Sequence, residues 1–146
     1  MDLRLDGKVA LVTGGSKGIG REIATAYAQS GAKVMITSRK ADACELAALE
    51  IGNGCEWYAS NVGYEDQVES LVDHTLDTFG AIDILVNNAG ANPYAGPTID
   101  VDVPRWDKTI QVNMTAPLVL TQLCWNKYMK ESKGDCSIIN ISSVGG

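Results

Sequence analysis

Short apolar runs alternate with amphipathic stretches along the chain. The apolar runs occupy residues 9–12, 34–37, 55–59, 82–86 and 137–141. They are short and most are rich in β-branched residues, which predicts buried strands. The amphipathic stretches occupy residues 18–30, 41–51, 68–79 and 103–129. Their apolar side chains recur at helical spacing, and Pro117 should bend the last stretch. Strands that alternate with helices of this length form a parallel sheet with right-handed crossovers.

Composition indicates an ordinary globular protein. The chain has 146 residues, of which 45% are hydrophobic and 21% charged, so we expect one domain over residues 1–146. It carries 18 acidic and 12 basic residues, for a net charge of −6, which disfavours nucleic acid as a partner. No apolar run approaches the roughly 18 residues of a membrane span, so we expect no membrane partner. We also see no signal-peptide core at the start of the sequence.

The cysteines and the histidine give no sign of a disulfide framework or a metal site. Four cysteines are widely spaced without a C-x-x-C pair, and there is one histidine. Zinc sites and disulfide scaffolds need closer clusters of such residues. We therefore expect four reduced cysteines, no metal, and a protein that works in the cytoplasm.

A glycine-rich turn carries the strongest chemical signal. Residues 13–20 read TGGSKGIG, directly after the first strand and at the start of the first helix. A pyrophosphate binds bare backbone N–H groups at such a helix N-terminus, where the helix dipole is positive. Gly14 would allow the tight turn, Gly18 would leave room for the phosphates, and Gly20 would let helix and strand pack closely. The alternative is a glycine-rich loop that binds nothing, which the strand–turn–helix context disfavours. The spacing excludes a P-loop.

Further motifs in the same order resemble those of the short-chain dehydrogenase/reductase family. After TGGSKGIG, the sequence Asn87-Asn88-Ala89-Gly90 follows the fourth strand, as the family's NNAG motif does. Asn113 matches the family's catalytic asparagine, and Ser143 its catalytic serine, with Ser142 as the register-shifted alternative. The resemblance covers nearly the whole chain. It implies an α/β fold: a Rossmann-type, doubly wound parallel sheet, with strands one to five of the family's usual seven.

The end of the second strand favours NADP(H) over NAD(H). An NAD site places an acidic residue there, whereas an NADP site offers space and positive charge. This strand ends at Ser38, and Arg39 follows it. Arg39 and Lys17 can converge on a 2′-phosphate, as in the family's NADP(H) members. The alternative is that both are solvated surface charges, as most such residues are.

The resemblance extends to the remaining cofactor contacts. Asn61 stands where the family usually has an aspartate that accepts a hydrogen bond from adenine, and its amide oxygen could still accept one. Val62 should pack on the adenine, and the NNAG motif should approach the adenosine ribose. The expected cofactor-binding residues are Gly14, Ser16, Lys17, Gly18, Ile19, Gly20, Ser38, Arg39, Asn61, Val62, Asn88, Ala89 and Gly90.

The family's catalytic tyrosine and lysine have no counterpart in these 146 residues. The Tyr-x-x-x-Lys motif lies on the helix after the fifth strand, and no tyrosine of this chain has a lysine four positions later. We therefore expect the chain to be truncated before that helix. Two accounts follow. The favoured one is part of an oxidoreductase that transfers hydride between NADP(H) and a small carbonyl or alcohol substrate, and that forms a homo-oligomer at full length. The other is a dinucleotide-binding or partner-binding fragment without turnover. The loop 92–95 is expected to line one wall of the substrate pocket.

Overall fold

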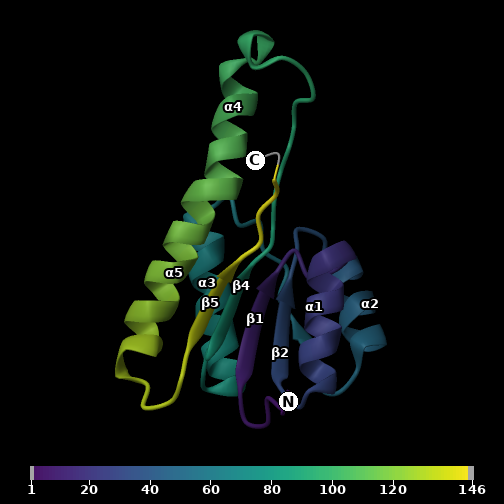
Figure 1. The fold of residues 1–146 in the computed structure, drawn as a ribbon, viewed down its shortest axis with the longest axis vertical. Helices are drawn as coiled ribbons and strands as arrows, with labels where there is room; N and C mark the ends of the chain where they lie inside the picture. Colours follow the sequence, from purple (N-terminus) through teal and green to yellow (C-terminus); the bar gives the residue numbers. More distant parts are fainter. Residues whose placement is uncertain (1, 145–146) are drawn as a thin grey trace.

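Five parallel strands form one sheet in the computed structural model, which describes residues 2–144. The strands are β1 (Val9–Thr13), β2 (Lys33–Thr37), β3 (Glu56–Trp57), β4 (Ile84–Asn87) and β5 (Ser137–Asn140). Their order across the sheet is β3-β2-β1-β4-β5 (Figure 1). The chain therefore starts in the middle of the sheet, winds out to one edge, and returns to build the other half. This arrangement confirms the predicted doubly wound α/β sheet.

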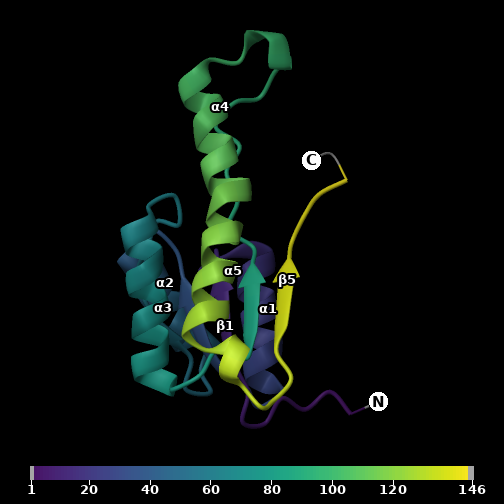
Figure 2. The same cartoon turned by 90° about the vertical axis from the view of Figure 1, so that its left-hand side faces the viewer.

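Helices cover both faces of the sheet. They are α1 (Gly18–Gln29), α2 (Ala41–Ile51), α3 (Glu65–Phe79), α4 (Val103–Ile110) and α5 (Ala116–Lys127), with two 3₁₀ turns, η1 (Thr98–Asp100) and η3 (Met129–Glu131). A π-helical segment, η2 (Gln111–Thr115), joins α4 to α5. Helices α1 and α2 pack on one face, and α3 and α5 on the other (Figure 1). Figure 2 shows strands β4 and β5 beside the α5 helix. None of the helices among the described residues is long and apolar enough to cross a membrane.

Two apolar clusters fill the space between the sheet and its helices. Because side chains alternate along a strand, Leu11 faces the cluster under α3 and α5, whereas Ala10 and Val12 face the cluster under α1 and α2. All five residues of β1 are buried, which explains why this central strand is a continuous apolar run. The small side chains of Ala24 and Ala28 let α1 lie close to the sheet. The predicted buried strand at this position is therefore confirmed.

The third strand is shorter than the sequence predicts. The run at 55–59 yields only β3, Glu56–Trp57, which pairs with β2 alone. At Tyr58 the backbone N–H still donates to the Ile36 carbonyl at 3.1 Å, and the Tyr58 carbonyl accepts from Thr37 Oγ1 at 2.6 Å. Strand β3 lies at the edge of the sheet and pairs on one side only. Beyond Trp57 the hydroxyl of Thr37, and not a backbone N–H, donates to the carbonyl of Tyr58.

The long helical region at 103–129 is broken before its proline. Asp102 caps the start of α4, because its side chain accepts from the Arg105 backbone N–H. The chain then widens into η2, and Pro117 lies in the first turn of α5. Proline has no N–H, so it cannot donate to the carbonyl of Asn113 as an α-helical residue would. The predicted disturbance is therefore a π-turn ahead of the proline. In Figure 1 the α4–α5 column rises well beyond the sheet.

Candidate functional site

A cavity of about 850 Å³ opens beyond the carboxyl ends of the central strands. This is the point where the strand order reverses between β1 and β4, and open α/β sheets bind their ligands at such a switch point. Its walls come from the loops that follow β1, β2, β3 and β4, and from the α4–η2 helix. Residues far apart in sequence therefore meet around one space.

Most of the predicted cofactor residues line this cavity. Those that do are Gly14, Ser16, Lys17, Gly18, Ser38, Arg39, Asn61, Val62, Asn88, Ala89 and Gly90. Ile19, Gly20, Asn113 and Ser143 do not line it. The cavity is also lined by residues that were not predicted from the sequence, including Thr37, Lys40, Ser60, Lys108 and Val112.

The glycine-rich turn forms a cradle at the start of α1. Gly14 and Gly18 have φ angles of +63° and +56°, a backbone conformation that other residues adopt only with strain. A Cβ at Gly14 would lie 2.8 Å from Asn88 Nδ2, whereas a Cβ at Gly18 would meet nothing within 4 Å. At Gly20 it would collide with the Gly14 carbonyl oxygen. Gly14 and Gly20 thus serve close packing, and Gly18 leaves open space at a helix N-terminus.

Thr13 holds the two central loops together. This side chain is 1% exposed. Its Oγ1 accepts from the backbone N–H of Asn88 at 3.0 Å and of Ala89 at 2.9 Å, and donates to the Val86 carbonyl at 3.3 Å. Thr13 is the first residue of the motif TGGSKGIG, but its bracing role was not predicted from the sequence. Its position at the end of a buried strand was the available signal.

The two asparagines after β4 tie neighbouring strands together. Asn88 Nδ2 donates to the Thr13 carbonyl at 3.0 Å and to the Gly14 carbonyl at 3.3 Å. Asn87 Nδ2 donates to Asn140 Oδ1 at 2.9 Å and so joins β4 to β5. Asn87 Oδ1 is buried and has no partner among the described residues. Both side chains therefore connect neighbouring strands of the sheet.

Cations gather on the cavity walls without acids. Lys17, Arg39 and Lys40 surround the ends of β1 and β2, and Lys108 lies on the α4 wall. No acidic side chain lines the cavity, and within residues 2–144 none of these four cations forms an ion pair. A cavity with this lining favours a polyanion, although the protein as a whole is acidic.

The loop after β3 is braced from α3. The Asn61 backbone N–H donates to Gln67 Oε1 at 2.8 Å, and Ser60 Oγ donates to the Gln67 carbonyl at 3.2 Å. Asn61 Oδ1 accepts from the Gly63 backbone N–H at 3.0 Å. Val62, 8% exposed, packs in the same apolar cluster as Val112. These contacts fix the outer wall of the cavity.

The two predicted catalytic residues lie outside the cavity lining. The side-chain amide of Asn113, in η2, forms two hydrogen bonds with the backbone of Ala91. Its Oδ1 accepts from the Ala91 N–H at 2.8 Å, and its Nδ2 donates to the Ala91 carbonyl at 2.9 Å. This clamp fixes the loop after β4 against the helix. Ser143 lies in the exposed segment after β5. Of the loop 92–95, Asn92 and Pro93 line the cavity.

Known proteins resemble this chain in sequence over most of its length. The sequence profile of the family described as short chain dehydrogenase matches residues 8–146. D-threitol dehydrogenase of Mycolicibacterium smegmatis is 35% identical over 145 residues, which cover 97% of this chain and 55% of that protein. Dehydrogenase/reductase SDR family member 4 of Homo sapiens is 38% identical over 143 residues, which cover 96% of this chain and 51% of that protein. The chain thus spans about half the length of the curated relatives it matches.

A solved structure matches closely in three dimensions. The 3-ketoacyl-(acyl-carrier-protein) reductase from Brucella melitensis, complexed with NADH, superposes with a TM-score of 0.91 at 36% identity. The match covers 97% of this chain and 59% of that one. The sheet and its helices are therefore arranged as in that reductase.

Proposed function

The chain belongs to the short chain dehydrogenase family, and we propose that it forms the cofactor-binding part of an NADP(H)-dependent oxidoreductase. We take residues 1–146 as a single NAD(P)-binding domain. The proposed reaction transfers hydride between the nicotinamide and a small carbonyl or alcohol substrate. When bound, the nicotinamide group supplies the hydride chemistry. The protein's own residues bind the dinucleotide and orient it.

The lining of the cavity carries this proposal. The Gly18 cradle leaves open space at the N-terminus of α1, where backbone N–H groups and the helix dipole suit a pyrophosphate. Beside it, Ser38, Arg39 and Lys40 follow β2. This position lacks the carboxylate that an NAD ribose would need. The chemistry of these residues therefore supports NADP(H) as the proposed cofactor.

Arg39 and Lys17 are the proposed ligands of the 2′-phosphate. Both are exposed and line the cavity, and both lack an ion-pair partner among residues 2–144. A guanidinium can meet a phosphate through two parallel hydrogen bonds. Asn113 would act indirectly, since its amide holds Ala91 at the cavity wall. Ser143 is proposed, by resemblance, to hold the substrate oxygen.

The test compares the affinities of NADP⁺ and NAD⁺ before and after Arg39→Asp. We expect the parent protein to prefer NADP⁺. The variant should lose about 10- to 100-fold in NADP⁺ affinity, since a hydrogen bond to a charged group contributes about 1.5–3 kcal/mol. Lys130→Asp makes the same charge change at the exposed Lys130, outside the cavity, and should leave the preference intact. Equal affinities in the parent protein would refute the NADP(H) assignment.

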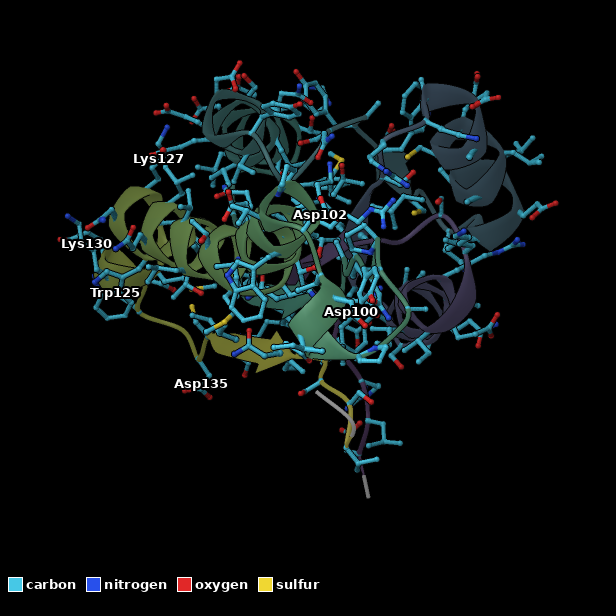
Figure 3. All side chains as sticks on the ribbon, turned by 90° about the horizontal axis from the view of Figure 1, so that it is seen from above. Asp100, Asp102, Trp125, Lys127, Lys130 and Asp135 are labelled. Atoms are coloured by element: carbon cyan, nitrogen blue, oxygen red, sulfur yellow. The ribbon has the colours of Figure 1, made fainter. Side chains whose placement is uncertain are left out.

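We also propose a homo-oligomer that works in the cytoplasm. On the outer face of the α4–α5 column, Met114, Leu118 and Trp125 are 65%, 56% and 53% exposed. Their spacing of four and seven residues places them on one helix face, and Figure 3 shows Trp125 at the outer margin of the molecule. Exposed apolar stripes of this kind favour association. Leu118→Glu should reduce the mass measured by light scattering.

The four cysteines, all free in the described structure, suit a reducing compartment.

A further inference from the structure

A tight turn joins the end of α2 to the start of β3. One hydrogen bond closes it, from the Cys55 backbone N–H to the Gly52 carbonyl at 2.9 Å. The two central residues, Asn53 and Gly54, have φ angles of +50° and +73°, as in a type I′ turn. Within residues 2–144, Asn53 is the only residue other than glycine with a positive φ. The turn therefore presents an asparagine directly before a glycine, the pair that such turns favour.

Neighbouring segments neither cover nor hold these two residues. Asn53 and Gly54 are both exposed. In the part of the chain that the structure describes, neither the Asn53 side-chain amide nor the Gly54 backbone N–H forms a hydrogen bond. A Cβ added at Gly52 or at Gly54 would meet no heavy atom within 4 Å beyond its own chain neighbours. Glycine on both sides therefore leaves the backbone around Asn53 free to change its dihedral angles.

An asparagine in this setting can react with the backbone that follows it. The Gly54 nitrogen, after losing its proton to a base such as hydroxide, attacks Cγ of the Asn53 side chain. A C–N bond forms, the bond from Cγ to the side-chain nitrogen breaks, and that nitrogen leaves as ammonia once it is protonated. Water then opens the resulting five-membered succinimide at either of its two carbonyl carbons. The products are aspartate and isoaspartate, and no oxidant or reductant takes part.

The identity of the next residue decides how easily the nitrogen can attack. Glycine has no Cβ to crowd its own nitrogen, and Asn53 is the only asparagine of the sequence that glycine follows. The exposed Asn126 lies inside α5, where the next N–H is engaged in the helical hydrogen-bond ladder. Asn92 precedes Pro93, which has no N–H. Sequence and structure therefore single out the same position.

We propose that Asn53 is a site of spontaneous covalent modification, at which the Gly54 nitrogen displaces ammonia and leaves aspartate or isoaspartate in the turn. Isoaspartate carries the backbone through the former side chain, so the turn gains one methylene group. The bond between the Cys55 N–H and the Gly52 carbonyl then loses its geometry, and the start of β3 loosens. None of residues 52–55 lines the cavity, so the modification affects stability whatever ligand the cavity binds.

The test incubates the protein at mildly alkaline pH and follows the product by mass spectrometry. Digestion after glutamate residues releases residues 51–56 as one peptide. We expect two products with the mass of the acid form, one with aspartate and one with isoaspartate. The rate should lie within about tenfold of the rate in guanidinium chloride, because the single hydrogen bond of the turn is worth about that factor. It should rise with pH, since the deprotonated nitrogen is the attacking group.

Asn53→Gln is the matched variant, because it keeps an amide whose attack would require a larger ring, and its peptide should stay unmodified. Asn126 is the internal reference and should remain an amide in the same sample. If folding slowed the reaction of Asn53 by more than about tenfold, the turn would protect the side chain and the inference would be overturned. Equal rates at Asn53 and Asn126 would overturn it as well.

The effect on β3 has a separate measurement. The converted protein carries one more negative charge, so ion exchange separates it from the unmodified form. It should unfold at a lower urea concentration than fresh protein. An unchanged midpoint would refute the loosening of β3.

Discussion

Replacing Thr13 by valine should destabilise the protein strongly although the shape of the side chain hardly changes. Thr13 Oγ1 accepts two backbone hydrogen bonds from the loop after β4, at 2.9 and 3.0 Å, and donates a third at 3.3 Å. Valine fills the same space but cannot accept or donate. The Asn88 and Ala89 N–H groups would then lose their acceptor in a partly buried setting.

The expected cost follows from these contacts. Each buried polar group left without a partner costs about 1–3 kcal/mol. Two N–H groups in half-buried residues, which water can partly reach, should together cost about 2–4 kcal/mol. That is a large share of the roughly 5–15 kcal/mol by which a domain of ordinary size is stable. With a urea slope of about 2 kcal/mol per molar, the unfolding midpoint should fall by about 1–2 M.

The assay is urea unfolding followed by circular dichroism. Thr13→Ser keeps the hydroxyl oxygen and loses one methyl group, so it should cost only about 1 kcal/mol. The reasoning would be wrong if Thr13→Val unfolded at the same urea concentration as the parent protein. It would also be wrong if the serine variant were as unstable as the valine variant, since packing and not hydrogen bonding would then explain the loss.

Three further predictions concern the cradle, the catalytic step and the cysteines. Gly18→Val should abolish dinucleotide binding, because the side chain enters the open space at the start of α1. Its φ of +56° adds about 1–2 kcal/mol of strain to the folded state, and calorimetry with a melting curve would separate the two effects. A polypeptide of residues 1–146 should not reduce ketones with NADPH, as followed by the NADPH absorbance at 340 nm. None of its tyrosines lines the cavity, and the general acid catalysis that is then missing contributes about 10²–10⁴-fold to the rate. Turnover at ordinary enzyme rates would contradict this prediction. Burial raises the pKa of the Cys124 thiol to about 12, so at pH 8 it stays protonated and should resist alkylation until the protein unfolds. Mass spectrometry of iodoacetamide-treated protein should show the half-buried Cys136 labelled first.

Local pattern determined the elements of the sheet and the glycine turn. A strand buried on both faces must be apolar throughout, so the run at Val9–Thr13 could be read without any knowledge of its neighbours. A tight turn at a helix N-terminus requires glycine for steric reasons, and Gly14 and Gly18 do adopt left-handed conformations. The order of strands and helices then fixed the fold class, because parallel strands need helical crossovers.

Contacts between distant segments were beyond the reach of pattern. Thr13 meets residues about 75 positions later, and nothing in its immediate sequence indicates that partner. The length of β3 depended on the single neighbour that an edge strand has. The pairing of Asn113 with Ala91, 22 positions earlier, depended on how the loop after β4 meets the helix. Each of these features is set by packing between elements and not by the preference of one element.

The chemistry of the cavity shows the same division. The sequence placed an amide at position 61 and cations at positions 17 and 39, but a side chain's identity does not say which of its atoms faces a ligand. Only the folded turn at Gly63, whose N–H must meet an oxygen, sets the direction of the Asn61 amide. Only the meeting of loops at the carboxyl edge of the sheet brings Lys108 to the same cavity as Arg39. Parallel strands deliver their loops to one edge, so the tertiary structure assembles a site from residues that the sequence keeps apart.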